Sequence, residues 1–145
     1  MIHNGVFTIS NAEGAHRTFR IRTQKPDASF RPGERIVALL SGPDNGRDYQ
    51  GFGFAHDDGI TVWQKKRGQG KQSAFDWYAF LLKKGCEALI GKDGAEASAG
   101  FNVGGRDYFI QVSRTCLRCN KRLTRPSSVL LGYGPECAGK VGLAS

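Results

Sequence analysis

Three cysteines near the C-terminal end of this chain have the spacing of metal ligands. Cys116 and Cys119 are separated by two residues, and seventeen residues then separate Cys119 from Cys137. Structural zinc takes four ligands, usually Cys or a mixture of Cys and His, at spacings of this kind. Pro135 is a favourable first residue of a helix, which would place Cys137 in a first turn, where free backbone N–H groups favour a thiolate. We therefore predict a structural zinc site held by these three cysteines.

The fourth zinc ligand must come from elsewhere, because this run contains three thiols. Cys86 falls on the apolar stripe of a predicted helix, where a free Cys usually behaves as a small buried hydrophobe. His3, His16 and His56 are the other candidates, since Cys3His is a common ligand set for zinc. A carboxylate, a water molecule, or a metal-free turn with buried thiols are open alternatives.

The segment around the cysteines also resembles a known family. Residues 116–140 combine the three thiols with Leu123, Ser128, Gly132, Gly134 and Pro135. In this they are similar to a short Cys-rich domain of actinobacterial and bacteriophage proteins, which has no settled function. The resemblance implies a zinc-knuckle module in a phage-encoded or mobile-element protein. It implies nothing about residues 1–113.

Positive charge is concentrated in the same segment. The whole chain has a formal net charge of +8, and residues 114–145 hold six cations against one anion, a net charge of +5. Such an excess predicts a phosphate-binding surface; the alternative is that these cations only keep a small domain soluble. A second basic run, residues 64–72, contains three consecutive cations. The predicted nucleic-acid-binding residues are Arg114, Arg118, Lys121, Arg122, Arg125, Lys65, Lys66 and Arg67.

The first part of the chain has the pattern of an antiparallel sheet. Short runs that alternate between apolar and polar residues are separated by turn sequences such as Asp58-Gly59, which suits a tight hairpin. In one such run, Phe19 and Ile21 are expected to face inward, with Arg20 and Arg22 on the opposite face. Five strands are predicted at residues 6–10, 17–23, 34–40, 49–56 and 60–65. Their order favours a small antiparallel barrel or a curled sheet.

One amphipathic helix is predicted at residues 73–90. Ser73 and Asp76 approximate a capping box, and Gly91 is a natural stop. The apolar stripe of this helix consists of Phe75, Tyr78, Leu82, Cys86 and Leu89, widened by Leu81 and Ile90. Residues 92–100 look small and loose, and residues 101–103 and 106–113 are expected to pair as a hairpin. The predicted fold class is therefore α+β: a β-rich body at 1–113, with a zinc-knuckle module at 114–145 packed on it.

Catalytic chemistry has little support. His56 and Asp57 are adjacent, but neighbours on a strand point to opposite faces. Asp44, Asp48, Asp57 and Asp58 could collect Mg²⁺, yet their settings are those of turn residues. The chain has no Gly-rich phosphate loop, and the motif of zinc deaminases is absent. We predict a protein that is not an enzyme.

Location and partners follow from these features. No apolar run is long enough to span a membrane, and the N-terminus lacks the features of a signal peptide. The cysteines are therefore expected to be reduced thiols in the cytoplasm.

Two functions remain. The first is binding of DNA or RNA through the zinc module and the basic run, with aromatic residues such as Trp63 or Tyr133 stacking on bases. The second is binding of a host protein, with zinc only stabilising the fold.

Overall fold

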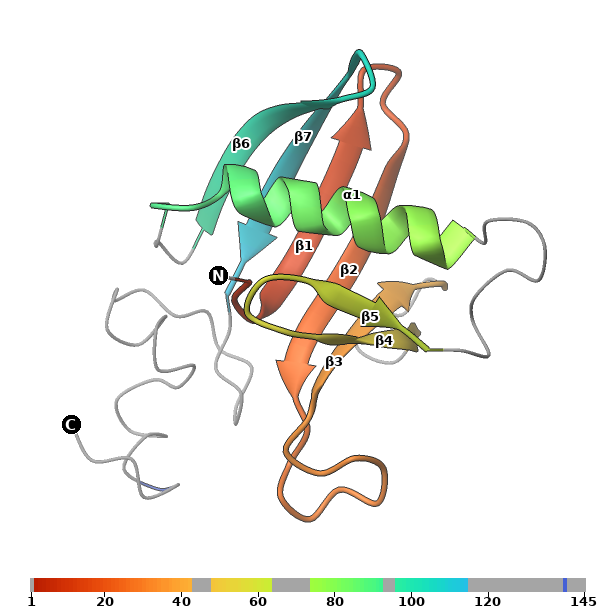
Figure 1. The fold of residues 1–145 in the computed structure, drawn as a ribbon, viewed down its shortest axis with the longest axis vertical. Coiled ribbons are helices and arrows are strands. Elements are labelled where there is room, and N and C mark those ends of the chain that lie inside the picture. The colour runs from red at the N-terminus through yellow and green to blue at the C-terminus, as the bar shows by residue number, and fades with distance from the viewer. Residues whose placement is uncertain (1, 43–47, 64–73, 93–95, 115–139, 141–145) are drawn as a thin grey trace.

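The computed structural model describes residues 2–42, 48–63, 74–92, 96–114 and 140. Within these residues the chain forms a seven-stranded antiparallel sheet and the helix α1 (Figure 1). The elements are, in chain order, β1 (Gly5–Asn11), β2 (His16–Thr23), β3 (Arg35–Leu40), β4 (Tyr49–Ala55), β5 (Ile60–Val62), α1 (Ala74–Ala88), β6 (Glu96–Val103) and β7 (Arg106–Ser113).

The order of strands in the sheet is β5-β4-β3-β2-β1-β7-β6. The first five strands follow one another as a meander, and the β6–β7 hairpin then pairs with the free side of β1. Helix α1 runs across the strands and contacts β5 near one edge of the sheet and β6 at the other (Figure 1). The sheet therefore curls around the helix, which confirms the predicted α+β class with a curled antiparallel sheet. The predicted zinc knuckle lies outside the described residues.

The alternation of side chains in β2 sets the two faces of the sheet. Phe19 and Ile21 are 0% and 1% exposed and face the helix, whereas Arg20 and Arg22 point to the other side. The same alternation sends Phe7 and Ile9 of β1 inward. We call the side covered by α1 the inner face and the opposite side the outer face.

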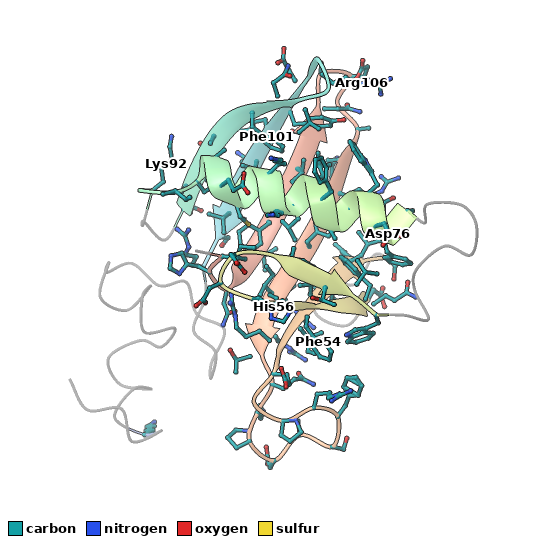
Figure 2. The ribbon with its side chains drawn as sticks, viewed as in Figure 1. Phe54, His56, Asp76, Lys92, Phe101 and Arg106 are labelled. Carbon is teal, nitrogen blue, oxygen red and sulfur yellow. The ribbon has the colours of Figure 1, made fainter. Side chains whose placement is uncertain are left out.

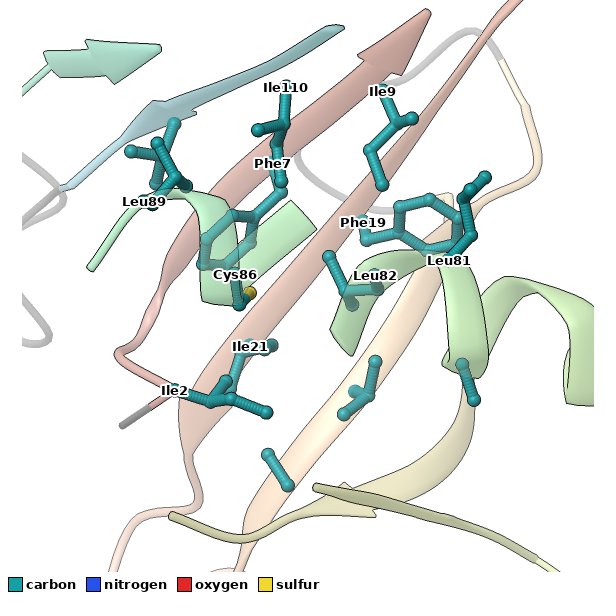
Figure 3. Close-up of a cluster of buried hydrophobic side chains, with 14 of the residues drawn as sticks. Ile2, Phe7, Ile9, Phe19, Ile21, Leu81, Leu82, Cys86, Leu89 and Ile110 are labelled. Atoms are coloured by element: carbon teal, nitrogen blue, oxygen red, sulfur yellow. The ribbon is translucent and has the colours of Figure 1, made fainter. Parts of the chain in front are cut away.

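The core fills the space between α1 and the inner face (Figure 3). Leu82, Cys86 and Leu89 project from the helix toward side chains such as Phe7 and Ile110. These helical residues belong to the predicted stripe, so the prediction of a core-facing helix is confirmed. Ile90 was expected to widen the stripe, but it follows the end of α1 and is 65% exposed.

Strand β6 begins earlier than the sequence indicates. Residues 96–100 were expected to be loose, because they are mostly Ala, Ser and Gly, which have low strand propensity. In the structure they pair with β7 without interruption, from Glu96 opposite Ser113 to Val103 opposite Arg106. The expectation was wrong because cross-strand pairing with the regular strand β7 outweighs the weak local preference of these residues.

No helix in the described ranges has the length and hydropathy that crossing a bilayer requires.

Candidate nucleic-acid interface

Besides the candidates for the fourth zinc ligand, Arg114 is the one residue predicted to bind metal or phosphate that falls within the described ranges. The others lie outside them: Cys116, Cys119, Cys137, Arg118, Lys121, Arg122, Arg125, Lys65, Lys66 and Arg67. Among the described residues, no group of three or more His, Cys, Asp or Glu side chains is placed to hold a metal ion.

Arg114 is buried, in contrast to the exposed position expected for a phosphate contact. Its side chain is 4% exposed, and its Nη1 donates a hydrogen bond to the carbonyl oxygen of Lys92 at 3.2 Å. Lys92 lies just beyond the C-terminal end of α1. Arg114 therefore joins the end of β7 to the end of the helix, and in the described structure its role is to anchor these two elements.

Cys86 is a buried thiol, as the sequence analysis preferred. It is 5% exposed, and its sulfur points from α1 into the core (Figure 3). Burial raises the pKa of the Cys86 thiol to about 12, although Arg114 and Arg35 act in the opposite direction. The neutral thiol is therefore favoured in the described structure, as for a buried Cys in apolar surroundings.

The three histidines lie at different places relative to the start of the C-terminal segment. His3 and Arg114 line the same cavity, of about 170 Å³. His16 is opposite Ser10 at the far end of β1, five residues or about 17 Å along the strand from Gly5. His56 is exposed, and its ring nitrogen Nε2 shares a hydrogen bond of 2.9 Å with the Thr61 hydroxyl.

The residues beside His3 are held in place by Arg35. Its Nε donates to Asn4 Oδ1 at 3.0 Å, and its Nη2 donates to the carbonyl oxygen of Ile2. Burial lowers the pKa of Arg35, and the charge of Asp57 opposes this shift. The N-terminal segment is thereby fixed next to the point where the chain leaves β7.

An aromatic cluster covers part of the outer face of β3 and β4. Trp63 follows β5 and lies over Gly51, where an added Cβ would be 3.0 Å from the indole ring. The ring centroids of Phe30 and Phe54 are 5.4 and 5.5 Å from that of Trp63. Figure 2 shows Phe54 beside the β4–β5 hairpin, toward the loop that joins β2 to β3. We call Phe30, Phe54 and Trp63 the outer aromatic cluster.

The β2–β3 loop presents Phe30 to this cluster. Gln24 organises the loop: its backbone amide donates to the carbonyl oxygen of Glu34 at 2.8 Å, and its side-chain Nε2 donates to that of Phe30 at 3.1 Å. Phe30 remains 45% exposed. Its backbone is therefore held by the loop and its ring lies against Trp63, with nearly half of the residue open to solvent.

One arginine contacts the outer aromatic cluster, and two more lie on the same face of the sheet. The guanidinium of Arg20 lies 4.2 Å from the centroid of the Tyr49 ring, and that of Arg31 lies 5.5 Å from the centroid of Phe54. Arg22 is exposed on the same face of β2 as Arg20. Contacts between Arg and aromatic rings of this kind are favourable, by about 0.5–1 kcal/mol at exposed sites.

These arginines have no acidic partners in the part of the chain that the structure describes. Burial lowers the pKa of Arg20, followed by the charge of Arg22, and no carboxylate contributes to the shift. The outward positions of β1 to β4 carry no Asp or Glu. The nearest acidic residues in sequence on this side, Asp27 and Glu34, are in the β2–β3 loop.

A shallow polar groove of about 730 Å³ continues the outer face across β1, β7 and β6. It begins beside the arginines, because Val6 of β1 is paired with Arg20. Its floor is polar: Thr8 of β1, Gln111 of β7 and Ser98 of β6 line it. Ser113, the last residue of β7, also lines the groove, so the C-terminal segment begins at its rim.

Helix α1 carries both acidic and basic side chains. It also carries two exposed aromatic residues. Trp77 and Phe80 are 38% and 43% exposed, with ring centroids 6.0 Å apart. Lys84 forms a surface ion pair with Glu87 at 3.7 Å on the same helix. Neither aromatic residue was assigned a role from the sequence. Both fall outside the apolar stripe of the helix, and this position in the sequence indicates an exposed ring.

The described fold is thus a curled antiparallel sheet around one helix, with arginines and aromatic rings on the face opposite α1. Residues 109–142 match a family of unknown function, DUF6011. They form a C-terminal domain whose first residues lie inside β7, so the strand that completes the body also begins this domain. No curated protein and no solved structure matches the chain significantly.

Proposed function

We propose that this protein binds nucleic acid. The observation that supports this function best is the position of Arg20 and Arg22, together with Arg31, on a face whose strands β1 to β4 present no outward carboxylate. Cations that stabilise a fold are usually interleaved with acids, as on α1. Strands that present arginines and no outward carboxylate attract a polyanion.

The basic C-terminal segment is the second part of this proposed surface. It leaves the body after Arg114, at the rim of the outer groove, and carries Arg118, Lys121, Arg122 and Arg125. The basic run with Lys65, Lys66 and Arg67 follows Trp63 of the outer aromatic cluster in sequence. In this proposal both segments add phosphate contacts, and a structural zinc ion held by Cys116, Cys119 and Cys137 orders the first of them. The phage-encoded origin is part of the same proposal.

Salt dependence of binding tests the proposal. Fluorescently labelled single-stranded and duplex DNA and RNA are titrated with the protein between about 50 and 200 mM salt. Each phosphate contact releases condensed counterions, so the affinity must fall steeply over this range. Replacing both Arg118 and Arg122 with Ala should flatten the plot of log affinity against log salt by roughly 1.5 to 2 units.

Lys83 and Lys84 on α1 provide the matched control. A Lys83→Ala, Lys84→Ala double variant loses the same charge from a surface where acids are interleaved, so its salt slope should stay close to that of the parent. If the parent binds none of the four nucleic acids at the lowest salt concentration, the proposal is wrong. If the two double variants behave alike, the C-terminal segment makes no phosphate contacts and that part of the proposal is wrong.

The second candidate function is binding of a host protein, which the exposed Trp77 and Phe80 favour. Together with Ile90, which is 65% exposed, they place apolar surface among charged side chains on and just after α1. Aromatic anchors with a polar rim are typical of protein interfaces. In this alternative the protein inhibits or redirects a host enzyme or defence system, and zinc has a purely structural role.

A further inference from the structure

We propose that the outer face of the sheet binds single-stranded nucleic acid, with bases stacked on the outer aromatic cluster and phosphates held by Arg20 and Arg22. This inference rests on the proposed function and adds the class of ligand and its binding site. It places the main contacts on the body, where Trp63 is the one residue of this site that was expected from the sequence to stack on bases.

The first argument is the exposure and support of the rings. Phe30 is 45% exposed, yet its loop and Trp63 hold it in place. A ring that is fixed before binding loses little conformational entropy when a base stacks on it. Stacking of a base on an aromatic side chain contributes about 1–3 kcal/mol and tolerates any base. Bases in a duplex are stacked on each other, so this contact selects a single strand.

Without a ligand, the arrangement of Arg20 and Arg22 is energetically unfavourable. Arg20 and Arg22 are two positions apart on one strand face, about 7 Å, and repel each other. Arg20 is partly buried, and its Nε has no hydrogen-bond partner within the described ranges. A structural arginine of this kind usually has a carboxylate or a carbonyl partner. Phosphate oxygens bound at this face would provide the negative charge that the two arginines lack.

The aromatic cluster, the arginines and the polar groove follow one another along the outer face. The outer aromatic cluster lies on β3 and β4, the arginines lie next to it on β2, and the polar groove follows on β1, β7 and β6. A single-stranded nucleic acid that crosses the sheet in this direction meets rings, then cations, then the hydroxyl and amide groups of the groove, which Lys92 and Glu96 also line. It ends near Ser113, where the basic C-terminal segment begins. Such a track combines stacking platforms with a positively charged path, as single-strand-binding surfaces do.

Two exposed residues give variants that should fold normally, Phe30→Ala and Arg22→Ala. With a single-stranded probe of about 16 nucleotides, Phe30→Ala should weaken binding about tenfold, because one stacking contact is lost. Arg22→Ala should also weaken it, and should reduce the salt slope by about 0.7, the value for one phosphate on a single strand. Binding of a duplex of the same length should change less than twofold in Phe30→Ala. The matched controls are Trp77→Ala and Lys84→Ala, which remove an exposed ring and an exposed cation from α1 and should leave single-strand binding unchanged.

Fluorescence provides a direct readout of the cluster. The chain contains two tryptophans, so Trp77→Phe leaves Trp63 as the single reporter. Stacking of bases around Trp63 should quench its emission when the single strand is added, and the Phe30→Ala change should weaken this response in parallel with the affinity.

The results of these experiments distinguish failure of the outer-face site from failure of nucleic-acid binding as a whole. If the Arg118 and Arg122 changes weaken binding while Phe30→Ala and Arg22→Ala do not, nucleic-acid binding is retained and the outer-face site is wrong. Equal loss of duplex and single-strand affinity in Phe30→Ala would also overturn it. If the parent binds no nucleic acid and Trp77→Ala abolishes capture of a host protein, both the inference and the proposed function fail.

Discussion

Cys86 shows how burial changes the chemistry of one residue. Its thiol is 5% exposed, and burial raises its pKa to about 12, whereas in the unfolded chain it ionises near pH 8.5. A group whose pKa is raised in the folded state stabilises the fold fully below the unfolded pKa, and this contribution is lost as the pH rises toward the folded pKa. The parent should therefore lose about 2 kcal/mol more unfolding free energy than Cys86→Ala between about pH 8 and pH 10.5, measured by urea denaturation.

At neutral pH the free energy of unfolding of the same Cys86→Ala variant should be lower than that of the parent by on the order of 1 kcal/mol, as for a small core truncation. Its zinc content should equal that of the parent. Identical pH dependence in the two proteins would show that the thiol is not buried as the structure has it. A loss of metal would move Cys86 into the ligand set.

The contact between α1 and β7 depends on the absence of a side chain at Gly85. A Cβ at this position would lie 2.6 Å from Cδ1 of Ile110, which is itself 0% exposed and has no space to move. Gly85→Ala gains about 1 kcal/mol in helix propensity but overpacks this contact, which typically costs 1–3 kcal/mol. We therefore expect the free energy of unfolding of Gly85→Ala, measured by chemical denaturation, to be about 1 kcal/mol lower than that of the parent.

Ile110→Val is the matched partner of this change, because it removes the Cδ1 atom that the new methyl group would meet. Alone it should cost about 0.5–1.5 kcal/mol. Combined with Gly85→Ala it should be more stable than the sum of the single changes predicts, a favourable coupling in the double-mutant cycle. Strictly additive effects would show that the helix does not approach β7 at this point.

The junction between the body and the C-terminal domain yields a prediction about the zinc site. Cys116 is two residues beyond Arg114, and two residues span at most about 7 Å. A zinc ion bound to Cys116 would therefore be closer to His3, which shares a cavity with Arg114, than to His16 at the far end of β1. We expect one zinc per chain, loss of zinc in Cys119→Ser, weakened zinc binding in His3→Ala and no change in His16→Ala, measured by metal analysis and chelator competition.

Two results would contradict this assignment. Equal zinc in the parent and in Cys119→Ser, or none in either, would remove the metal site altogether. Equal chelator resistance in His3→Ala and His16→Ala would remove His3 as the fourth ligand and leave His56, a carboxylate or a water molecule in that position.

The elements of the body could be predicted from local patterns. Alternation placed Phe19 and Ile21 on one side of β2 and Arg20 and Arg22 on the other, because successive side chains of a strand point to opposite faces. The stripe through Leu82 and Cys86 indicated which side of the helix is buried. The thiol spacing, on which the zinc hypothesis depends, is also a local pattern, and it lies in residues that the structure does not describe.

The tertiary structure decided which of these residues meet. The pairing of β7 with β1 buries Arg114, and the irregular pairing of β3 with β4 places Gly51 beneath Trp63, so that Phe30 and Phe54 gather beside the arginines. None of this follows from periodicity, which assigns residues to a face but does not say which face is covered or which strands are neighbours. Those choices depend on contacts between residues far apart in the chain, whose free energy comes from burying the whole sheet against α1.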